Sequence, residues 1–445
     1  MERDTVEPRV ESLPGESARR TVDFHHRHAA PSTYVYDFVW DYTAPAIGPF
    51  CTDVDGNVLL DFTAQVGTIP LGYNNPKVMD PLAEFDVPDP LTIAGQDFYL
   101  PAESVGDAPL PGPADLMARL TDISAQYGMD TVFLSNSGAE AVENALKISF
   151  DFTRGKYLVT TLGAFHGRTL GTLSLNRSKA VHRQQFPEIA SVEAVPFCTD
   201  RDCSAATCDC GFFTGETSAL RRLLGPGGSV DPAEVAAIVV EPVQGEGGYR
   251  IPSQEFGAEL AACCDDFDVP LVADEIQSGL GRTGEWWASD HYAFDPDVIA
   301  SAKGLRVGAT ISREEVFPDE RSRLSSTWGA GDILKSAVGA LTIDAIEEHD
   351  LLSHAETQGR QAVELLEEAT LPGAVDVRGL GLMLAVEFES PEYRDAVMEA
   401  AFHEGLLTLG CGRKTLRLLP PLDVRDRELR IGVELLAEAA QTASV

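Results

Sequence analysis

The sequence predicts an α/β protein whose large domain contains a mostly parallel sheet covered by helices, together with a smaller α/β domain. Between residues 114 and 333, continuous apolar runs of four or five residues alternate with helical stretches. Such runs are typical of parallel strands that are buried on both faces, whereas one-sided sheets show alternating polar and apolar residues. A chain of 445 residues is also long enough for more than one domain.

The residues before the large domain divide into three stretches. Residues 1–30 are polar and irregular, and we expect a mobile N-terminal tail. Asp55-Gly56-Asn57 separates two apolar runs and predicts the turn of a β-hairpin. Residues 31–113 are expected to belong to the smaller domain and, through the Pro- and Gly-rich stretch 101–113, to cross into the large domain.

The large domain is expected to span residues 114–333, and residues 334–445 are expected to complete the smaller domain. In the large domain we predict strands at 131–134, 157–161, 236–240, 270–274 and 297–300, with helices at 140–150 and 256–264. In the C-terminal part we predict helices at 333–348 and 354–368 and strands at 382–388 and 415–419.

The charge of the chain argues against nucleic acid and membranes as partners. Seventy acidic against thirty-four basic residues give a formal net charge of −36, which repels both. Only seven of the basic residues are lysine, and the acidic residues are spread along the whole chain. This composition favours a protein from a halophile with an acidic surface, and an ordinary acidic cytosolic enzyme is the alternative. The acidic, polar start predicts no export signal, so we expect a cytoplasmic protein with reduced thiols.

Two residues at the ends of predicted strands indicate a cofactor. Lys303 follows the apolar run 297–300, and Asp274 ends the run 270–274. A desolvated lysine can lose its proton and form a Schiff base with an aldehyde, which arginine cannot. A buried aspartate can hold a pyridine nitrogen protonated. Together they predict pyridoxal 5'-phosphate as the cofactor.

Other candidates fit the same cofactor, each with an ordinary structural alternative. Ser137, Gly138 and Ala139 fall at a predicted helix start, where free N–H groups favour a phosphate, although Ser137 could simply cap the helix with Glu140 in a capping box. Phe165 and Ile276 could cover the two faces of the ring, or be plain core. Gln277 could reach the phenolic oxygen of the ring.

Three charged residues could recognise substrate. Arg168 and Arg417 each stand beside apolar sequence, and a guanidinium pairs bidentately with a carboxylate. A structural ion pair is the common alternative for such an arginine. Glu246 lies among glycines, and its carboxylate could neutralise one arginine when a substrate has no carboxylate there.

From about residue 35 to the C-terminus, the ordered set of these motifs resembles the class III pyridoxal-phosphate aminotransferases of fold type I. The resemblance is to the 4-aminobutyrate, ornithine and acetylornithine enzymes. It implies that Lys303 is the Schiff-base lysine, that Asp274 pairs with the pyridine nitrogen, and that Ser137, Gly138 and Ala139 bind the phosphate. It also implies that His166 belongs to the cofactor site.

The same resemblance assigns the substrate residues and the oligomer. Arg168 is similar to the arginine that holds a distal carboxylate, Arg417 to the one that holds the α-carboxylate, and Glu246 to a gating glutamate. Thr327, in Ser326-Thr-Trp-Gly, matches a threonine that reaches the phosphate of the neighbouring subunit, which implies a homodimer.

The implied activity is ping-pong transamination through an aldimine on Lys303. The expected donor is an ω-amino acid such as 4-aminobutyrate, ornithine or acetylornithine, and the expected acceptor a 2-oxo acid such as 2-oxoglutarate. An amino-acid racemase or aminomutase of the same fold is the alternative, since both need the same cofactor residues. A cofactor-free binding protein would have lost Lys303 or Asp274, and neither is lost.

Two features depart from the family pattern. Lys303-Gly-Leu-Arg-Val-Gly-Ala-Thr is shorter than the usual glycine-rich run, and Arg306 within it could alter substrate fit. Cys198, Cys203, Cys208 and Cys210 lie in one short polar stretch and could bind a structural zinc ion or an iron–sulfur cluster. The spacing lacks the usual Cys-x-x-Cys pairs, so a loop of free thiols is the alternative.

Overall fold

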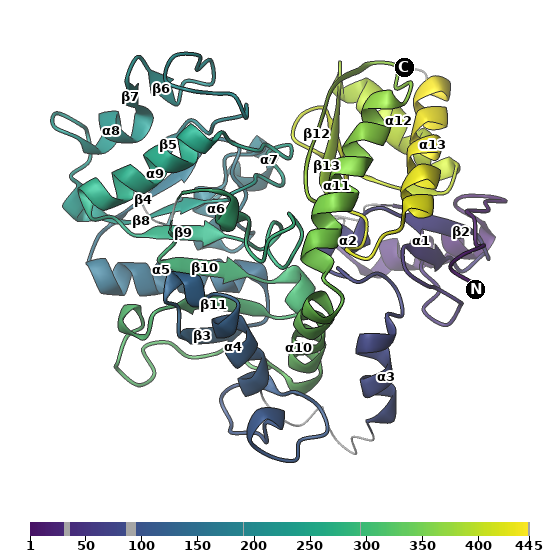
Figure 1. Cartoon of the computed structure of the whole chain (residues 1–445), viewed down its shortest axis with the longest axis horizontal. Coiled ribbons are helices and arrows are strands. Elements are labelled where there is room, and N and C mark those ends of the chain that lie inside the picture. The colour runs from purple at the N-terminus through teal and green to yellow at the C-terminus, as the bar shows by residue number, and fades with distance from the viewer. Residues whose placement is uncertain (31–35, 86–94, 190, 294, 444–445) are drawn as a thin grey trace. The chain divides into compact units, whose positions relative to one another are not determined.

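The computed structural model describes residues 1–30, 36–85, 95–189, 191–293 and 295–443 (Figure 1). The chain forms two compact units. The terminal unit contains Met1–Met79 and His354–Val445, and the central unit contains Asp80–Ser353. The first residues of the segment predicted at 31–113, and nine residues inside it (86–94), lie outside the described part of the chain.

A seven-stranded sheet forms the middle of the central unit (Figure 1). Its order is β3-β11-β10-β9-β8-β4-β5, and β11 alone runs antiparallel to its neighbours. The strands are β3 (Thr131–Ser135), β4 (Tyr157–Thr161), β5 (Ser191–Val195), β8 (Val235–Val240), β9 (Leu271–Asp274), β10 (Val298–Ser301) and β11 (Gly308–Ser312). All five strands predicted for this domain are confirmed, as is the mostly parallel sheet.

Helix α5 (Gly138–Thr153) covers one face of this sheet. Val272 and Val298 pack in one buried cluster with Ala141 and Ala145 of the helix. The four side chains are fully buried, which explains why the strands read as continuous apolar runs. The helix predicted at 140–150 is therefore confirmed within a longer element.

Helices α4 (Pro113–Asp122) and α10 (Ile333–Glu348) cover the opposite face. Ala273 and Ile299, whose side chains alternate with those of the first face, pack in a second buried cluster with both helices. The other helices of the central unit are α6 (Leu170–Leu175), α7 (Ala180–Arg183), α8 (Ala219–Leu224) and α9 (Gln254–Phe267), beside a short ribbon of β6 (Phe213–Thr214) and β7 (Thr217–Ser218).

The division between the units differs from the sequence prediction. We expected the C-terminal domain to begin at residue 334, whereas α10 belongs to the central unit and the division falls after Ser353. The reason is packing, because Ala340 and Ile343 of α10 complete the cluster formed with α4. The chain passes from one unit to the other twice, after Met79 within α3 (Pro76–Glu84) and after Ser353 within α11 (Leu351–Glu368).

The terminal unit contains two smaller sheets. The three-stranded sheet has the order β1-β2-β14 and the four-stranded sheet has the order β12-β13-β16-β15. Their strands are β1 (Phe50–Thr52), β2 (Val58–Asp61), β12 (Ala374–Leu380), β13 (Met383–Phe388), β14 (Leu406–Leu407), β15 (Leu409–Cys411) and β16 (Thr415–Leu418), with helices α1 (Glu16–His28), α2 (Ala64–Gly67), α12 (Pro391–His403) and α13 (Asp426–Thr442). The predicted hairpin is confirmed, and Gly56 in its turn has a φ of +86°.

The N-terminal residues differ from the expected irregular tail. Residues 16–28 form α1, and Arg3 makes ion pairs with Asp423 (2.6 Å) and Glu428 (2.7 Å). Asp55, in the hairpin turn, accepts hydrogen bonds from the first free N–H groups of α1 at 2.7 and 2.8 Å. These partners are distant in sequence, so local composition gave no sign of them.

None of the helices in the described part of the chain has both the length and the apolar character needed to cross a bilayer.

Candidate active site

Lys303 and Asp274 lie at the same edge of the central sheet. Asp274 is the last residue of β9, and β10 beside it ends two residues before Lys303. The two strands are parallel neighbours, with Ala300 opposite Asp274. Because adjacent parallel strands end at one edge, the sheet brings these two predicted residues together.

The backbone at Lys303 is left-handed. Its φ is +48°, and it begins a short 3-10 turn that ends where Arg306, with a φ of +62°, donates its N–H to the Lys303 carbonyl at 2.9 Å. Left-handed backbone costs about 1 kcal/mol for a residue with a Cβ. The turn reverses the chain from β10 into antiparallel β11, and the half-buried lysine occupies its first position.

Asp274 is buried, with 4% of its surface exposed, and is held by two hydrogen bonds. Its Oδ2 accepts from Nδ1 of His166 at 2.8 Å, and its Oδ1 accepts from the N–H of Ile276 at 3.1 Å. Burial lowers the pKa of His166, but the bond to Asp274 and the charges of Asp274 and Glu241 outweigh it and raise that pKa. The carboxylate is therefore fixed in orientation and faces a group that readily carries a proton.

Glu241 is a member of this buried group that our sequence analysis missed. It directly follows β8, and its carboxylate accepts hydrogen bonds from the N–H of Phe165 (2.9 Å) and of Gly245 (3.0 Å). Burial, together with the charge of Asp274, raises its pKa to about 7, although His166 opposes the shift. A charged residue straight after an apolar strand is the signal that identified Asp274, and it applies equally here.

The predicted phosphate-binding residues stand at the start of the 16-residue helix α5. Ser137 is its N-cap, and its Oγ accepts from the N–H of Glu140 at 3.2 Å. A Cβ on Gly138 would lie 2.8 Å from the Cδ1 of Ile276, so a larger residue there would force the Ile276 side chain to shift. The carboxylate of Glu140 accepts from Asn136 at 2.6 Å rather than from Ser137, so the predicted capping box is only half formed. The exposed helix start keeps the geometry that favours an anion.

Phe165 and Gln277 are both positioned by neighbours. The half-buried ring of Phe165 lies edge-on to His182, with 5.1 Å between centroids. Oε1 of Gln277 accepts from the hydroxyl of buried Tyr249 at 2.8 Å. This bond identifies Oε1 as the acceptor end of the amide and Nε2 as the donor end.

The predicted substrate residues of the central unit form one group. The guanidinium of exposed Arg168 lies 5.6 Å from the ring centroid of Phe165. Glu246 forms an ion pair with Lys179 at 3.5 Å. Burial first, and then the charges of Arg168 and Lys179, lower the pKa of His182, while the charge of Glu246 opposes them. The four charged or titratable side chains therefore influence one another.

The predicted residues Arg417 and Thr327 belong to different units of the chain. Arg417 is buried in β16 of the terminal unit, paired across the sheet with Ala385 and Leu409. Thr327 is exposed in the central unit beside the start of α5, where its Oγ1 accepts from Nδ2 of Asn136 at 2.7 Å. The four predicted metal ligands also come together, in a loop after β5.

Residues 39–440 match the family model "Aminotransferase class-III". The chain belongs to the class III aminotransferases. It is 31% identical over 434 residues to an acetylornithine aminotransferase of Methanopyrus kandleri, which covers 96% of this chain and 99% of that protein. It is 31% identical over 392 residues to a putrescine aminotransferase of Pectobacterium atrosepticum, covering 84% of this chain and 76% of the relative. The structure of a lysine aminotransferase from M. tuberculosis superposes with a TM-score of 0.83 at 28% identity, covering 96% and 100% of the two chains.

The family, the fold type I architecture and the enzyme class predicted from the sequence are thereby confirmed, and so is pyridoxal phosphate as the cofactor. The residues of this aminotransferase fit that group. A buried, oriented carboxylate suits a protonated ring nitrogen, and the start of α5 suits a phosphate. Because Gly138 has no side chain, Ile276 can pack closely against the start of α5.

Proposed function

We propose that this aminotransferase removes the terminal amino group of an ω-amino acid, such as 4-aminobutyrate, ornithine or acetylornithine, and passes it to a 2-oxo acid such as 2-oxoglutarate. The observation that carries the proposal is the group of Arg168, Lys179 and Glu246 beside Phe165. Cations near a carboxylate that can neutralise them suit an enzyme that binds one substrate with a distal carboxylate and one without. The acetylornithine, putrescine and lysine named for the relatives all carry a free amino group at a chain end.

Pyridoxal phosphate supplies an aldehyde that condenses with amines and a ring that accepts electrons from the substrate carbon. The protein residues supply the rest. Asp274, oriented by His166, would hold the proton on the ring nitrogen, and the N–H groups at Ser137, Gly138 and Ala139 would bind the phosphate.

Lys303 acts as the base and acid on the reacting carbon in this proposal. Its amine would remove a proton from the substrate carbon and deliver it to the aldehyde carbon of the cofactor, a task that requires an amine able to lose its own proton. The left-handed turn fixes the backbone from which the side chain projects. Arg417 is proposed as the α-carboxylate residue by its match to the family motif.

The activities for which the relatives are named favour transamination over the racemase or aminomutase alternative. A panel of amino donors, each offered with 2-oxoglutarate, tests both points. Donors with a terminal amino group should yield glutamate, and 2-amino acids lacking one should not. A strict preference for 2-amino donors would refute the ω-amino proposal. Exchange of the α-proton without any conversion of 2-oxoglutarate would instead indicate an isomerase.

We also infer a homodimer in which Thr327 reaches the phosphate site of the partner. Thr327 is exposed and is followed by Trp328, whose surface is 81% exposed. The N–H of Gln96 donates to the carbonyl of Ala330 at 2.9 Å, and this bond ties the loop that carries exposed Phe98 and Tyr99 to the same region. Exposed aromatic residues gathered in this way are typical of an interface. The mass in solution, measured by light scattering, tests the inference.

The net charge of −36 supports a salt-adapted acidic surface, and the eight free thiols support a cytoplasmic location. The first is tested by the salt dependence described in the Discussion.

A further inference from the structure

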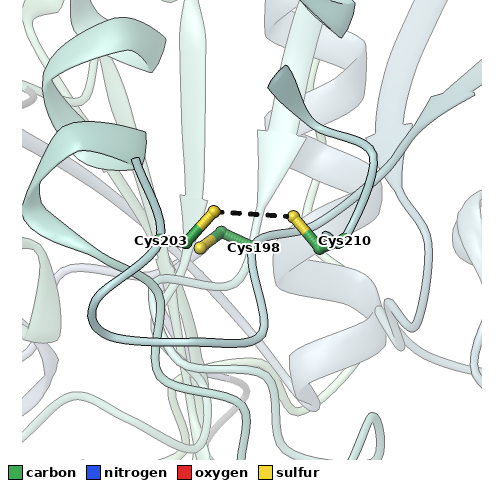
Figure 2. A group of neighbouring side chains, drawn as sticks. All are labelled: Cys198, Cys203 and Cys210. Carbon is green, nitrogen blue, oxygen red and sulfur yellow. Dashed lines mark hydrogen bonds between the residues drawn. The ribbon is translucent and has the colours of Figure 1, made fainter. Parts of the chain in front are cut away.

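Four cysteines of the central unit form a cluster of sulfur atoms apart from the proposed cofactor and substrate residues. We call Cys198, Cys203, Cys208 and Cys210 the thiol cluster. The Sγ atoms of Cys198, Cys203 and Cys210 all lie within 4.8 Å of one another, and those of Cys203 and Cys210 face each other (Figure 2). Cys208 completes the cluster, with its Sγ 3.4 Å from that of Cys210.

The sulfur separations suit a metal ion better than disulfide bonds. The Cys203 and Cys210 sulfurs are 3.8 Å apart, and all eight cysteines are free thiols. Four thiolates around a tetrahedral zinc ion, with Zn–S bonds of about 2.3 Å, lie about 3.8 Å from one another. A disulfide needs about 2.0 Å. Cys208 lies outside the group whose sulfurs are all within 4.8 Å of one another, so its side chain would have to move to complete the coordination sphere.

The loop that carries the thiol cluster has little else to hold it. Residues 198–211 contain no helix or strand, and their apolar side chains other than the cysteines are two alanines. Cys198 and Cys203 are buried in a cluster with Phe197, Phe212 and Phe256. Ala205 and the other two thiols pack against the same cluster, so thiols make most of the apolar contacts of this polar loop. A polar loop of this size gains little from burial, and a metal cross-link replaces the missing apolar core.

One backbone N–H group points at the thiol cluster from the C-terminal side of the loop. Phe213 donates to the Sγ of Cys208 at 3.3 Å. Gly211, two residues earlier, has a φ of +84°, a left-handed conformation that glycine adopts readily. The backbone at this end of the loop therefore fixes the position of Cys208.

We propose that the thiol cluster binds one zinc ion through its four sulfurs. Each thiol loses a proton to solvent on binding, and nothing is oxidised or reduced. Four protein ligands leave no coordination position for water or substrate, so the ion is structural and ties residues 198–211 to the core of the central unit. The ligand set is compatible with iron as well, and the test below separates the two metals.

Metal analysis of the full-length holoenzyme, purified without chelator or metal-affinity resin, tests the proposal. We expect about one zinc per chain in the wild type and in the control Cys263→Ser. Cys263 is buried in the same core, but its Sγ contacts Ser218 and Glu259 instead of the thiol cluster. The double variant C203S/C210S should contain no zinc and should melt at a lower temperature, while Cys263→Ser should melt close to the wild type.

A second measurement covers the case in which the double variant does not fold. Wild-type protein stripped of metal and titrated with cobalt(II) should develop the thiolate-to-cobalt charge-transfer absorption of a tetrahedral site, saturating at about one cobalt per chain. Absence of both zinc and the cobalt signal would refute the site. Finding iron and acid-labile sulfide in equal amounts would show that the cysteines hold an iron–sulfur cluster instead of zinc. If free thiols disappear in pairs when no reductant is present, the cysteines form disulfides instead.

Discussion

His166 donates from Nδ1 to Oδ2 of Asp274 over 2.8 Å, and both side chains are buried at the edge of the central sheet. His166 fixes one carboxylate oxygen of Asp274 by this hydrogen bond, and the backbone N–H of Ile276 fixes the other by a second one. The pair keeps a negative charge at one place and in one orientation, as a protonated ring nitrogen requires.

Asp274→Asn should lower kcat by at least about a hundredfold, because a neutral amide does not hold the proton on the ring nitrogen as a carboxylate does, and a loss of about 2.7 kcal/mol in the transition state is a hundredfold in rate. The amide is isosteric, so the fold should persist. Steady-state rates with a saturating donor measure the effect. The exposed Asp265 of α9 supplies the control, and Asp265→Asn should keep the wild-type rate. Comparable kcat values for the two variants would contradict the role of Asp274.

Lys303→Ala should abolish turnover while the far-ultraviolet circular dichroism stays that of the wild type. Lys303→Arg should be equally inactive, because a guanidinium does not lose its proton near neutral pH and cannot move a proton to the substrate carbon. Lys335→Ala, which removes a half-exposed lysine paired with Asp332, is the matched control. Activity of the arginine variant above a few per cent of the wild type would rule out the assigned role.

Glu241→Gln should change how stability depends on pH. The folded protein holds this proton up to a pKa of about 7, whereas the ordinary value is 4.5. Between these values the unfolded chain has released the proton and the folded protein has not, so the free energy of unfolding falls as pH rises through this window. The variant should show a shallower fall in urea unfolding between about pH 5 and 8.

The fall should not vanish in that variant, because burial also raises the pKa of Glu275 to about 7. Glu285→Gln, at an exposed position, should reproduce the wild-type slope. If Glu241→Gln and Glu285→Gln gave the same slope, Glu241 would not be the buried titrating group that its geometry indicates.

Raising the salt concentration should stabilise the protein. With a net charge of −36, self-repulsion opposes the folded state, and the screening length falls from about 10 Å at 0.1 M salt to about 3 Å at 1 M. Thermal melting in potassium chloride should therefore shift upward across this range, and low salt should also release cofactor. A melting temperature indifferent to salt would count against a salt-adapted surface.

The sequence predicted most of the sheet because its strands are buried on both faces and read as apolar runs. Strand β11 was missed, since it directly follows the turn at Lys303 and its residues Gly308-Ala-Thr-Ile-Ser include no long apolar run. Helix α1 was missed because its start is satisfied by Asp55, a partner in a distant hairpin. A capping partner that is distant in sequence leaves no recognisable pattern in the residues of the helix itself.

The candidate site shows the same contrast. Lys303 and Asp274 could be found because strand ends at one edge of a parallel sheet meet in space. The bond of Asp274 to His166 could not be foreseen from the 108 positions that separate them. The pairing of Glu246 with Lys179 likewise depends on how two loops fold back, which neither loop's composition specifies.

The left-handed backbone at Lys303 places two independent demands on one position. The chemistry needs an amine, and the turn needs a residue that tolerates a positive φ, for which glycine and asparagine are better suited than lysine. A saturation library at codon 303 would therefore give opposite rankings under two selections. Sorting for soluble yield should enrich glycine and asparagine and deplete valine and isoleucine. A selection in which cell growth depends on the reaction should return lysine alone.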